Sequence, residues 1–404
     1  MSGRLRRSKP PAVFKTIRIK GRSRPAITSR STQPSITSGA LRRVVIAPDK
    51  FKGSASAHEV ANAVARGIAT VAPSSDLVIR PMADGGDGTV ELFLDSGARA
   101  CTANVHDPLG RPIAARFALE GERAIVELAS ASGLVLEKPA ERDPWRADSR
   151  GTGELIRAAL DAGAKAIVIG VGGSAINDAG IGLLRALGAK TQPADALHGI
   201  ESIDLSGLDP RIAETDLLVA SDVDNPLCGP NGASAIFGPQ KGAKPQDVPK
   251  LDAALAQTAD AMARAIGRDM RDVPGAGAAG GAGFALLALG ARLRPGVEIV
   301  AELCGLPQAL SGATLCVTGE GSIDRQTLRG KTVFGVARYA ARANVPVIAL
   351  GGRVDTGVEA ELAAHGIVCE PVLTAPMPVE EAMRDALPLI EAASARIARM
   401  LVLE

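Results

Sequence analysis

Residues 42–79 read RRVVIAPDKFKGSASAHEVANAVARGIATVAPSSDLVI, and they show the pattern of a strand, a helix and a second strand. The apolar run 44–47 predicts the first strand, and the apolar run 77–79 predicts the second. Between them, Ser56 and Glu59 have the spacing of a helix capping box. Apolar residues then recur at helical spacing, at Val60, Val64, Ile68 and Val71. A unit of this kind predicts two parallel strands joined by a crossover helix.

Alternating strands and helices are predicted again near the C-terminus, but the middle of the chain has a different pattern. Residues 103–130 favour antiparallel strands, with a Glu-Gly turn between two apolar runs. Amphipathic helices are predicted over 152–162 and 250–267, and strand–helix alternation resumes after residue 314. A final helix is predicted near 379–399.

These patterns predict an α/β protein of two domains. A length of 404 residues suits two or three domains. We expect a discontinuous parallel α/β domain formed by residues 42–100 and 290–404, and an inserted mixed α/β domain at 101–289. Residues 1–41 are rich in Ser, Thr, Pro and Arg, and we predict a disordered basic tail there. The sequence leaves open whether this segment is a transit peptide, a tail or an upstream extension.

Charge and composition exclude several functions. The chain has 46 Lys and Arg against 44 Asp and Glu, but residues 1–48 hold 12 of the basic residues and none of the acidic ones. The other 34 basic residues therefore face all 44 acids, a net charge of −10, which argues against a nucleic-acid partner. Aromatic residues are only 2%, and the absence of a long uncharged apolar run predicts no membrane span.

Five scattered cysteines without a C-x-x-C pair predict reduced thiols in a cytoplasmic protein. The sequence does not distinguish a monomer from a homodimer.

Acidic and glycine-rich segments follow five of the predicted strands. In open α/β sheets, ligands bind outside the carboxyl ends of the strands, and glycines there let backbone N–H groups approach an anion. Carboxylates on the same loops need a cation between themselves and a phosphate, normally Mg²⁺. Together with nearby lysines they predict phosphoryl transfer. The five segments are 49–54, 84–89, 172–178, 221–225 and 318–324.

Each loop also has a purely structural explanation. A Gly-Gly-Asp segment is often only a turn, and an Asp after a strand often caps a helix, as Asp178 would cap a helix at 179–188. Residues 275–280 match G-x-G-x-x-G, but no strand precedes them, so a dinucleotide fingerprint is not supported. Gly330-Lys331-Thr332 ends like a P-loop, yet Arg325 occupies the position of its first glycine.

Eight segments in order resemble the bacterial glycerate kinases, which phosphorylate D-glycerate with ATP. The segments are APDKFKG (47–53), ADGGDGT (83–89), SRGTGE (149–154), GGSAIND (172–178), DVDNPL (222–227), FGPQKGA (237–243), VPGAGAAGG (273–281) and TGEGSID (318–324). The resemblance implies a flavodoxin-like parallel-sheet domain, a second mixed α/β domain and an active site in the cleft between them. It also implies ATP and Mg²⁺ as cofactors and 2-phosphoglycerate as the favoured product, in glyoxylate metabolism.

On this basis we assign roles to twelve residues. Asp178 is the expected base, Asn177 positions the substrate, and Asp84 is the alternative base. Asp222 and Glu320 are the expected metal ligands. The remaining residues are expected to bind substrate or phosphate: Lys52, Lys241 and Lys331 as phosphate-facing cations, Arg150 at the glycerate carboxylate, and Ser174, Gly275 and Gly277 along the loops.

Two other functions would also be compatible with part of the sequence. A non-catalytic sensor of glycerate or nucleotide with a kinase-like fold would need to have lost the acids at 84, 178, 222 and 320, which are present. An NAD-dependent oxidoreductase would rest on the glycine pattern at 275–280 alone. Which glycerate hydroxyl is phosphorylated, 2- or 3-, is not decided by the sequence.

Overall fold

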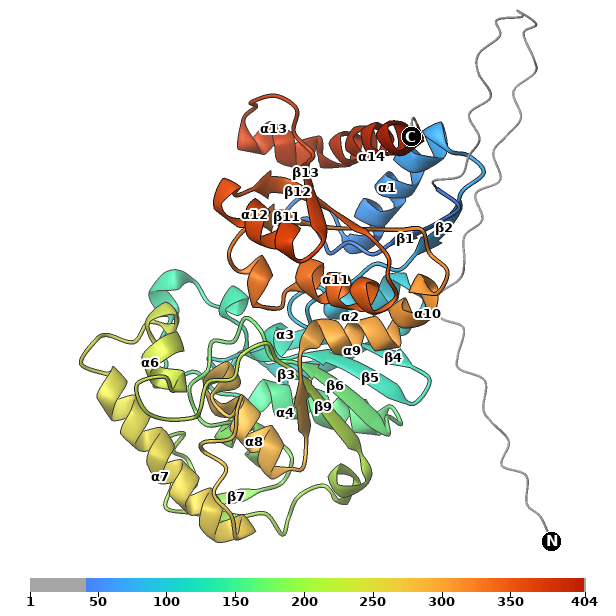
Figure 1. Cartoon of the computed structure of the whole chain (residues 1–404). Coiled ribbons are helices and arrows are strands. Elements are labelled where there is room, and N and C mark those ends of the chain that lie inside the picture. The colour runs from blue at the N-terminus through green and yellow to red at the C-terminus, as the bar shows by residue number, and fades with distance from the viewer. Residues whose placement is uncertain (1–40, 403–404) are drawn as a thin grey trace, which may run out of the picture.

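The computed structural model describes residues 41–402, and two separate β-sheets organise it (Figure 1). A five-stranded sheet has the order β13-β12-β11-β1-β2, and every pairing in it is parallel. A six-stranded sheet has the order β10-β9-β6-β5-β4-β3 and is antiparallel only at the β3-β4-β5 end. The parallel sheet comprises β1 (Arg43–Ile46), β2 (Asp76–Ile79), β11 (Leu315–Ile323), β12 (Val347–Val354) and β13 (Ile367–Pro371). The mixed sheet comprises β3 (Arg99–His106), β4 (Pro112–Glu120), β5 (Arg123–Glu127), β6 (Ala166–Gly170), β9 (Asp216–Ala220) and β10 (Arg292–Arg294).

The parallel sheet confirms the predicted strand–helix–strand unit. In β1, Val44 and Ile46 pack toward one face and Val45 toward the other, because side chains alternate along a strand. The chain leaves this sheet after β2 and returns at β11, which pairs with β1. The helices associated with this sheet are α1 (Ala57–Val71), α2 (Thr89–Asp95), α9 (Gly296–Leu303), α10 (Leu306–Leu310), α11 (Thr332–Arg342), α12 (Thr356–Ala364), α13 (Val379–Arg384) and α14 (Ala386–Val402).

Helix α1 begins with the predicted capping box. Ser56 accepts a hydrogen bond from the Glu59 backbone N–H, and the Glu59 carboxylate accepts one from the Ser56 N–H. The helix then packs closely against α14: a Cβ added at Gly67 would lie 2.2 Å from the Glu391 carbonyl oxygen. The two ends of the described chain are therefore held together on the outer face of the parallel sheet.

The helix predicted near 379–399 is two helices, α13 and α14. Pro388 lies in the first turn of α14, where its missing N–H has no helical partner to lose. Its ring would clash with the Arg384 carbonyl if the helix continued through that point. The break between Arg384 and Ala386 follows from this clash.

The remaining elements are helices and a separate two-stranded sheet, and most of them lie in the part of the chain that forms the mixed sheet. Residues 99–127 form the predicted antiparallel strands, with the register Ala118 opposite Ile125. The other elements are β7 (Lys190–Gln192), β8 (Ser202–Asp204), α3 (Ala129–Ser132), α4 (Arg150–Asp161), α5 (Ile181–Ala186), α6 (Ala233–Phe237), α7 (Val248–Ile266) and α8 (Ala282–Ala288). Short 3-10 helices are η1 (Leu134–Leu136), η2 (Pro139–Glu141), η3 (Pro210–Glu214), η4 (Pro239–Lys241), η5 (Ala278–Gly281) and η6 (Thr327–Arg329).

One apolar core is shared between the two sheets. Helices α2, α9 and α11 lie between them (Figure 1). Ala118, Ile125 and Val168 of the mixed sheet pack in the same buried cluster as Val297 of α9 and Val333 of α11. The two sheets are thus joined by a packed layer rather than by linkers alone.

The fold class is the predicted one, with one fully parallel sheet and one mixed sheet. The mixed sheet begins at Arg99 and ends at Arg294, and the domain limits at 100/101 and 289/290 remain our proposal. The predicted tail at 1–41 lies outside the described residues except for Leu41, which is buried. Within residues 41–402, no helix combines the length and apolar character needed to cross a bilayer.

Candidate active site

Four acidic residues meet where the two sheets face each other. Asp49 follows β1, Asp84 follows β2, and Glu320 lies in β11, so neighbouring parallel strands bring these three to one sheet edge. Asp222 follows β9 of the mixed sheet and comes from the opposite side. The negative charge of Asp84 acts on each of the other three carboxylates.

Glycines make this approach possible. A Cβ added at Gly85 would lie 2.6 Å from Ala220 Cβ at the end of β9. A Cβ at Gly296 would lie 1.9 Å from the Asp84 carbonyl oxygen. Only glycine fits at either position, and this close packing places Asp84 against the mixed sheet. The Gly296 N–H also donates a hydrogen bond of 3.0 Å to Asp222 Oδ1, which fixes that carboxylate.

The environment disfavours the ionised form of three of these acids. Burial, and then the charge of Asp84, raise the pKa of Asp49 to about 7. Burial raises the pKa of Glu320 to about 7, with smaller contributions from Asp324 and Asp84. Solvent reaches the Asp222 side chain, yet desolvation by the cleft walls, and then the charge of Asp84, raise its pKa to about 6. A group of carboxylates held in this state favours a positive charge among them.

Hydroxyl groups and one lysine balance part of this charge. Thr332 donates to Asp49 Oδ2, and the Lys50 N–H donates to Asp49 Oδ1 at 2.7 Å. Thr327 donates to Glu320 Oε1 at 2.6 Å. The Lys331 ammonium lowers the pKa of both Glu320 and Asp222, so it lies near both acids, as expected for a phosphate-facing cation.

The donor set suits a cation that is shared with phosphate. Across residues 41–402, no three His, Cys, Asp or Glu side chains converge closely enough to hold a metal ion by themselves. Mg²⁺ typically takes only one or two carboxylates and completes its shell with water and phosphate oxygens. Asp222 and Glu320, with Asp84 acting on both, therefore fit Mg²⁺ arriving with a nucleotide better than a resident all-protein metal site.

Two pockets adjoin the acids. The cleft pocket, about 240 Å³, contains Asp84 and Asp222 and lies on the mixed-sheet side. Ser174, a predicted site residue, lines it with Gly172 and Gly173. The loop pocket, about 390 Å³, lies between residues 49–59 and α2 with the segment before it. Asp49 lines the loop pocket, so each pocket holds at least one of the four acids, while Glu320 lines neither.

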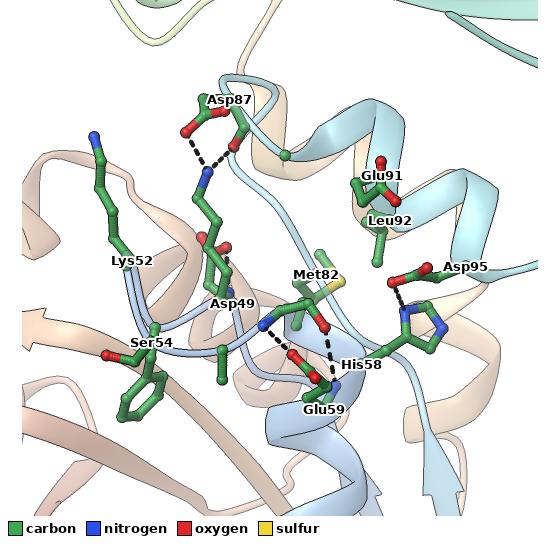
Figure 2. A pocket seen from close by; sticks show the side chains of 17 residues that line it. Asp49, Lys52, Ser54, His58, Glu59, Met82, Asp87, Glu91, Leu92 and Asp95 are labelled. Atoms are coloured by element: carbon green, nitrogen blue, oxygen red, sulfur yellow. Dashed lines mark hydrogen bonds and ion pairs between the residues drawn. The ribbon is translucent and has the colours of Figure 1, made fainter. Parts of the chain in front are cut away.

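Figure 2 shows the loop pocket from close by. The Lys50 ammonium pairs with Asp87, with Nζ 2.6 Å from Asp87 Oδ2, and ties the 49–53 loop to the segment before α2. Lys52 extends from the same loop, and no hydrogen bond or ion pair engages its ammonium within the described chain (Figure 2). Lys52 is thus a free cation on the loop that also carries Asp49.

The structure places Asp178 away from both pockets. Its side chain is fully buried, and its carboxylate accepts hydrogen bonds from Ser149 N (3.0 Å), Ser149 Oγ (2.6 Å), Gly180 N (3.0 Å) and Gly182 N (3.1 Å). These bonds hold the turn before α5 to the start of α4. The geometry therefore favours a structural role for Asp178 in the turn before α5, which was the alternative to a catalytic base.

Asn177 and Lys241 are also buried in this region. Asn177 Nδ2 donates to Ser234 Oγ at 3.0 Å, and Asn177 Oδ1 has no hydrogen-bond partner within the described chain. Lys241 is 1% exposed and donates to the Ile176 carbonyl oxygen at 2.6 Å. Burial lowers the pKa of Lys241 to about 7, although the charge of Asp178 opposes the shift. Lys241 supports the 174–178 loop from behind and does not face the pocket.

Three other predicted residues lie outside the pockets. Arg150 Nε donates to Glu154 Oε1 at 2.7 Å on an exposed face, so its guanidinium is already paired. Gly275 and Gly277 are buried beneath the cleft pocket, and a Cβ at Gly277 would lie 2.2 Å from the Pro226 carbonyl oxygen. The residues that follow them, Ala278 and Ala279, line the pocket instead.

Asp49 is the residue that the role assignments missed. The sequence places it in one of the five strand-end segments and in the first family-like motif, as it does Asp84. Nothing in the linear pattern separates an acid at the sheet edge from one that only turns the chain. The order of strands, with β1 between β11 and β2, is what brings Asp49 beside the other acids.

Comparisons with known proteins agree on one family. The family model described as "Glycerate kinase family" matches residues 44–402. The chain is similar to "Glycerate 2-kinase" of Escherichia coli K12, with 45% identity over 89% of this chain and 98% of that protein. It is similar to "Glycerate kinase" of Bacillus subtilis 168, with 43% identity over 89% and 100% of the two chains. A solved structure of a glycerate kinase 2 from Salmonella typhimurium LT2 superposes with a TM-score of 0.81 and 43% identity, covering 89% of this chain and 98% of that one.

Proposed function

Because the chain belongs to the glycerate kinase family, we propose that it transfers the γ-phosphoryl group of ATP to the 2-hydroxyl of D-glycerate. The products are then 2-phosphoglycerate and ADP. The observation that carries this proposal is the meeting of Asp49, Asp84, Asp222 and Glu320 near Lys331, with two pockets adjoining these acids. The name of the E. coli relative, a glycerate 2-kinase, supports the choice of hydroxyl.

The transfer needs little covalent chemistry from the protein. The bond between the γ-phosphorus and the bridging oxygen of ATP breaks, and a bond forms from that phosphorus to the 2-oxygen of glycerate. The hydroxyl proton passes to a carboxylate, and ADP leaves with the electron pair of the broken bond. The protein has to position both substrates, accept this proton and stabilise the developing negative charge.

We assign the proton acceptor to Asp84. It lines the cleft pocket, and its charge acts on Asp49, which lines the loop pocket, so it stands where the two substrates would meet. Its Oδ1 accepts a hydrogen bond of 2.9 Å from the Gly86 N–H, which orients the carboxylate and leaves Oδ2 for the substrate. Asp178, the first choice from the sequence, has its carboxylate engaged by four donors and serves this proposal as a positioning residue.

Asp222 and Glu320 would hold Mg²⁺ together with phosphate oxygens, and the ion would neutralise charge on the transferring group. Lys331 beside both acids supplies a fixed positive charge for the same phosphates. The five cysteines are all free thiols, which supports work in a reducing compartment such as the cytoplasm. Whether the protein acts as a monomer or a homodimer stays a prediction.

The test is direct. Purified protein is incubated with D-glycerate, ATP and Mg²⁺, and the product is identified by ³¹P NMR. We expect the resonance of 2-phosphoglycerate. A 3-phosphoglycerate resonance would overturn the choice of hydroxyl, and ATP consumption without a phosphoglycerate would overturn the substrate. A sensor would bind glycerate without turnover, but the acids that it would have lost are present.

A further inference from the structure

Exposed apolar side chains lie on the cleft pocket and on the segments next to it. Val223 lines the pocket and is 37% exposed, and Ile236, next to the lining residue Phe237, is 47% exposed. Val135 is 83% exposed on η1, whose Leu134 N–H donates to the carbonyl oxygen of the lining residue Gly173 at 2.9 Å. Of the seven large apolar side chains that the described chain exposes, one therefore lines this pocket and two belong to segments that adjoin its lining. Such a concentration marks a binding surface.

The same pocket continues inward to a surface without side chains. Gly86, Gly172 and Gly173 form this part, and a Cβ added at Gly172 would lie 3.3 Å from Gly86 Cα. Gly173 has a φ of +71°, a backbone conformation that favours glycine. Beyond these glycines lie Asp84 and Asp222, with Lys331 near the latter. One cavity thus has an apolar mouth, a bare backbone wall and an acidic end.

The loop pocket has a different lining. Charged or hydroxyl groups surround it. Besides Asp49, four of its acids are engaged by other groups: Glu59 by the Ser56 N–H, Asp87 by Lys50, Glu91 by Arg116 and Asp95 by His58. Lys52 and Ser54 complete the polar lining. Its large apolar lining residues Phe51, Met82 and Leu92 are 4%, 0% and 3% exposed, so their own side chains offer little apolar surface to a ligand. This lining suits a small hydroxy acid and not a flat heterocycle.

We propose that the nucleotide occupies the cleft pocket with its base against Phe237, Val223 and Ile236, and that glycerate occupies the loop pocket with its carboxylate at Lys52. The inference rests on the proposed function. The phosphates then pass over Gly172 and Gly173 and reach the acids from the mixed-sheet side. Glycerate reaches them from the parallel-sheet side, past Asp49. Lys52 thus replaces Arg150 as the residue that binds the glycerate carboxylate, because Arg150 is paired with Glu154 outside the pockets.

The nucleotide half is tested by ADP binding without glycerate, measured by isothermal titration calorimetry in the presence of Mg²⁺. Phe237→Ala removes the ring against which the base would stack, and we expect the Kd for ADP to rise about 5- to 100-fold, the range for losing one stacked base. Inorganic tripolyphosphate has no base, so its Kd should change less than about twofold. Ile236→Asp alters an exposed side chain, and it carries the test if Phe237→Ala does not fold.

Val368→Asp is the matched control, because Val368 is 62% exposed on the edge strand β13 of the other sheet. It should leave the Kd for ADP unchanged. Wild-type protein that does not bind ADP would overturn the proposed function itself. Wild-type protein that binds ADP while Phe237→Ala or Ile236→Asp binds it equally well would overturn only the assignment of the pocket.

Lys52→Met tests the glycerate half. We expect the KM for glycerate to rise at least tenfold while the Kd for ADP stays within about twofold, since a carboxylate partner is lost and the nucleotide site is untouched. A weaker Kd for ADP with an unchanged KM for glycerate would reverse the two pockets and refute the proposal.

Discussion

The substitution Asp84→Asn should slow turnover strongly and make the protein more stable. Asn keeps the shape of the side chain, and its Oδ1 can still accept the hydrogen bond from the Gly86 N–H. It cannot accept the hydroxyl proton, and general acid–base catalysis typically contributes 10²–10⁴-fold to the rate. We therefore expect kcat to fall by about 10²–10⁴ with little change in the Kd for ADP.

The gain in stability comes from relieved repulsion. The charge of Asp84 acts on Asp49, Asp222 and Glu320. With solvent screening, each ionised pair is worth about 1 kcal/mol, so removing one charge gains roughly 3 kcal/mol at pH 8 without ligand. The entropy of unfolding is about 2.1 cal/mol/K per residue, or about 0.8 kcal/mol/K for roughly 360 ordered residues, so Tm should rise by about 4 °C.

Both quantities are easily measured. Turnover is followed by a coupled assay for ADP, and Tm by scanning calorimetry at pH 8 in EDTA without nucleotide. A variant whose kcat stays within threefold of wild type would remove Asp84 from catalysis. A variant that melts below wild type would show that the acids do not repel one another as argued.

Three further outcomes are expected. Asp178→Asn should lower Tm by several degrees, because an amide cannot accept all four hydrogen bonds of that carboxylate and the buried Lys241 loses the negative charge near it. Thermal unfolding measures this effect, and a Tm equal to that of wild type contradicts it. The pKa values of Asp49, Glu320 and Asp222 are raised to about 7, 7 and 6, so the native state binds more protons than the unfolded state between about pH 4 and 7. These groups should therefore make the ligand-free Tm fall as pH rises through that window, while kcat rises. A pH series on wild type and Asp84→Asn tests both signs, and the slope of Tm against pH should be shallower for the variant. EDTA should stop turnover and excess Mg²⁺ should restore it, and activity that persists in metal-free buffer would remove Asp222 and Glu320 from their proposed roles.

The sequence located the acids better than it assigned their roles. Asp49, Asp84 and Glu320 follow or end apolar strands, and strands that prove to be parallel neighbours must bring such residues to one edge. Asp222 belongs to the other sheet, and its position depends on the close contact of Gly85 with Ala220, which has no signature in the sequence. Asp178, Lys241 and Arg150 belong to motifs of the same kind, yet their side chains are buried or already paired, because a motif does not indicate which way a side chain points.

Asp178 illustrates the limit most clearly. An acid after a buried strand and a glycine turn fits a catalytic base and a turn-holding acceptor equally well. The donors that decide between them come from Ser149, 29 residues earlier, and from the two glycines that follow. Tertiary contacts of this range are not expressed in local spacing.

The return of the chain to the parallel sheet also constrains its biosynthesis. Strand β1 has β11 as one neighbour, and α1 packs on α14, so the first βαβ unit is finished by residues from 315 onward. A ribosome adds about 5–20 residues per second, so residues 42–79 wait roughly 15–65 s for these partners. The mixed sheet, which ends at Arg294, is synthesised earlier and can fold first. During that interval the nascent β1 edge and the apolar face of α1 are uncovered, and they are the surfaces that a chaperone at the exit tunnel would meet.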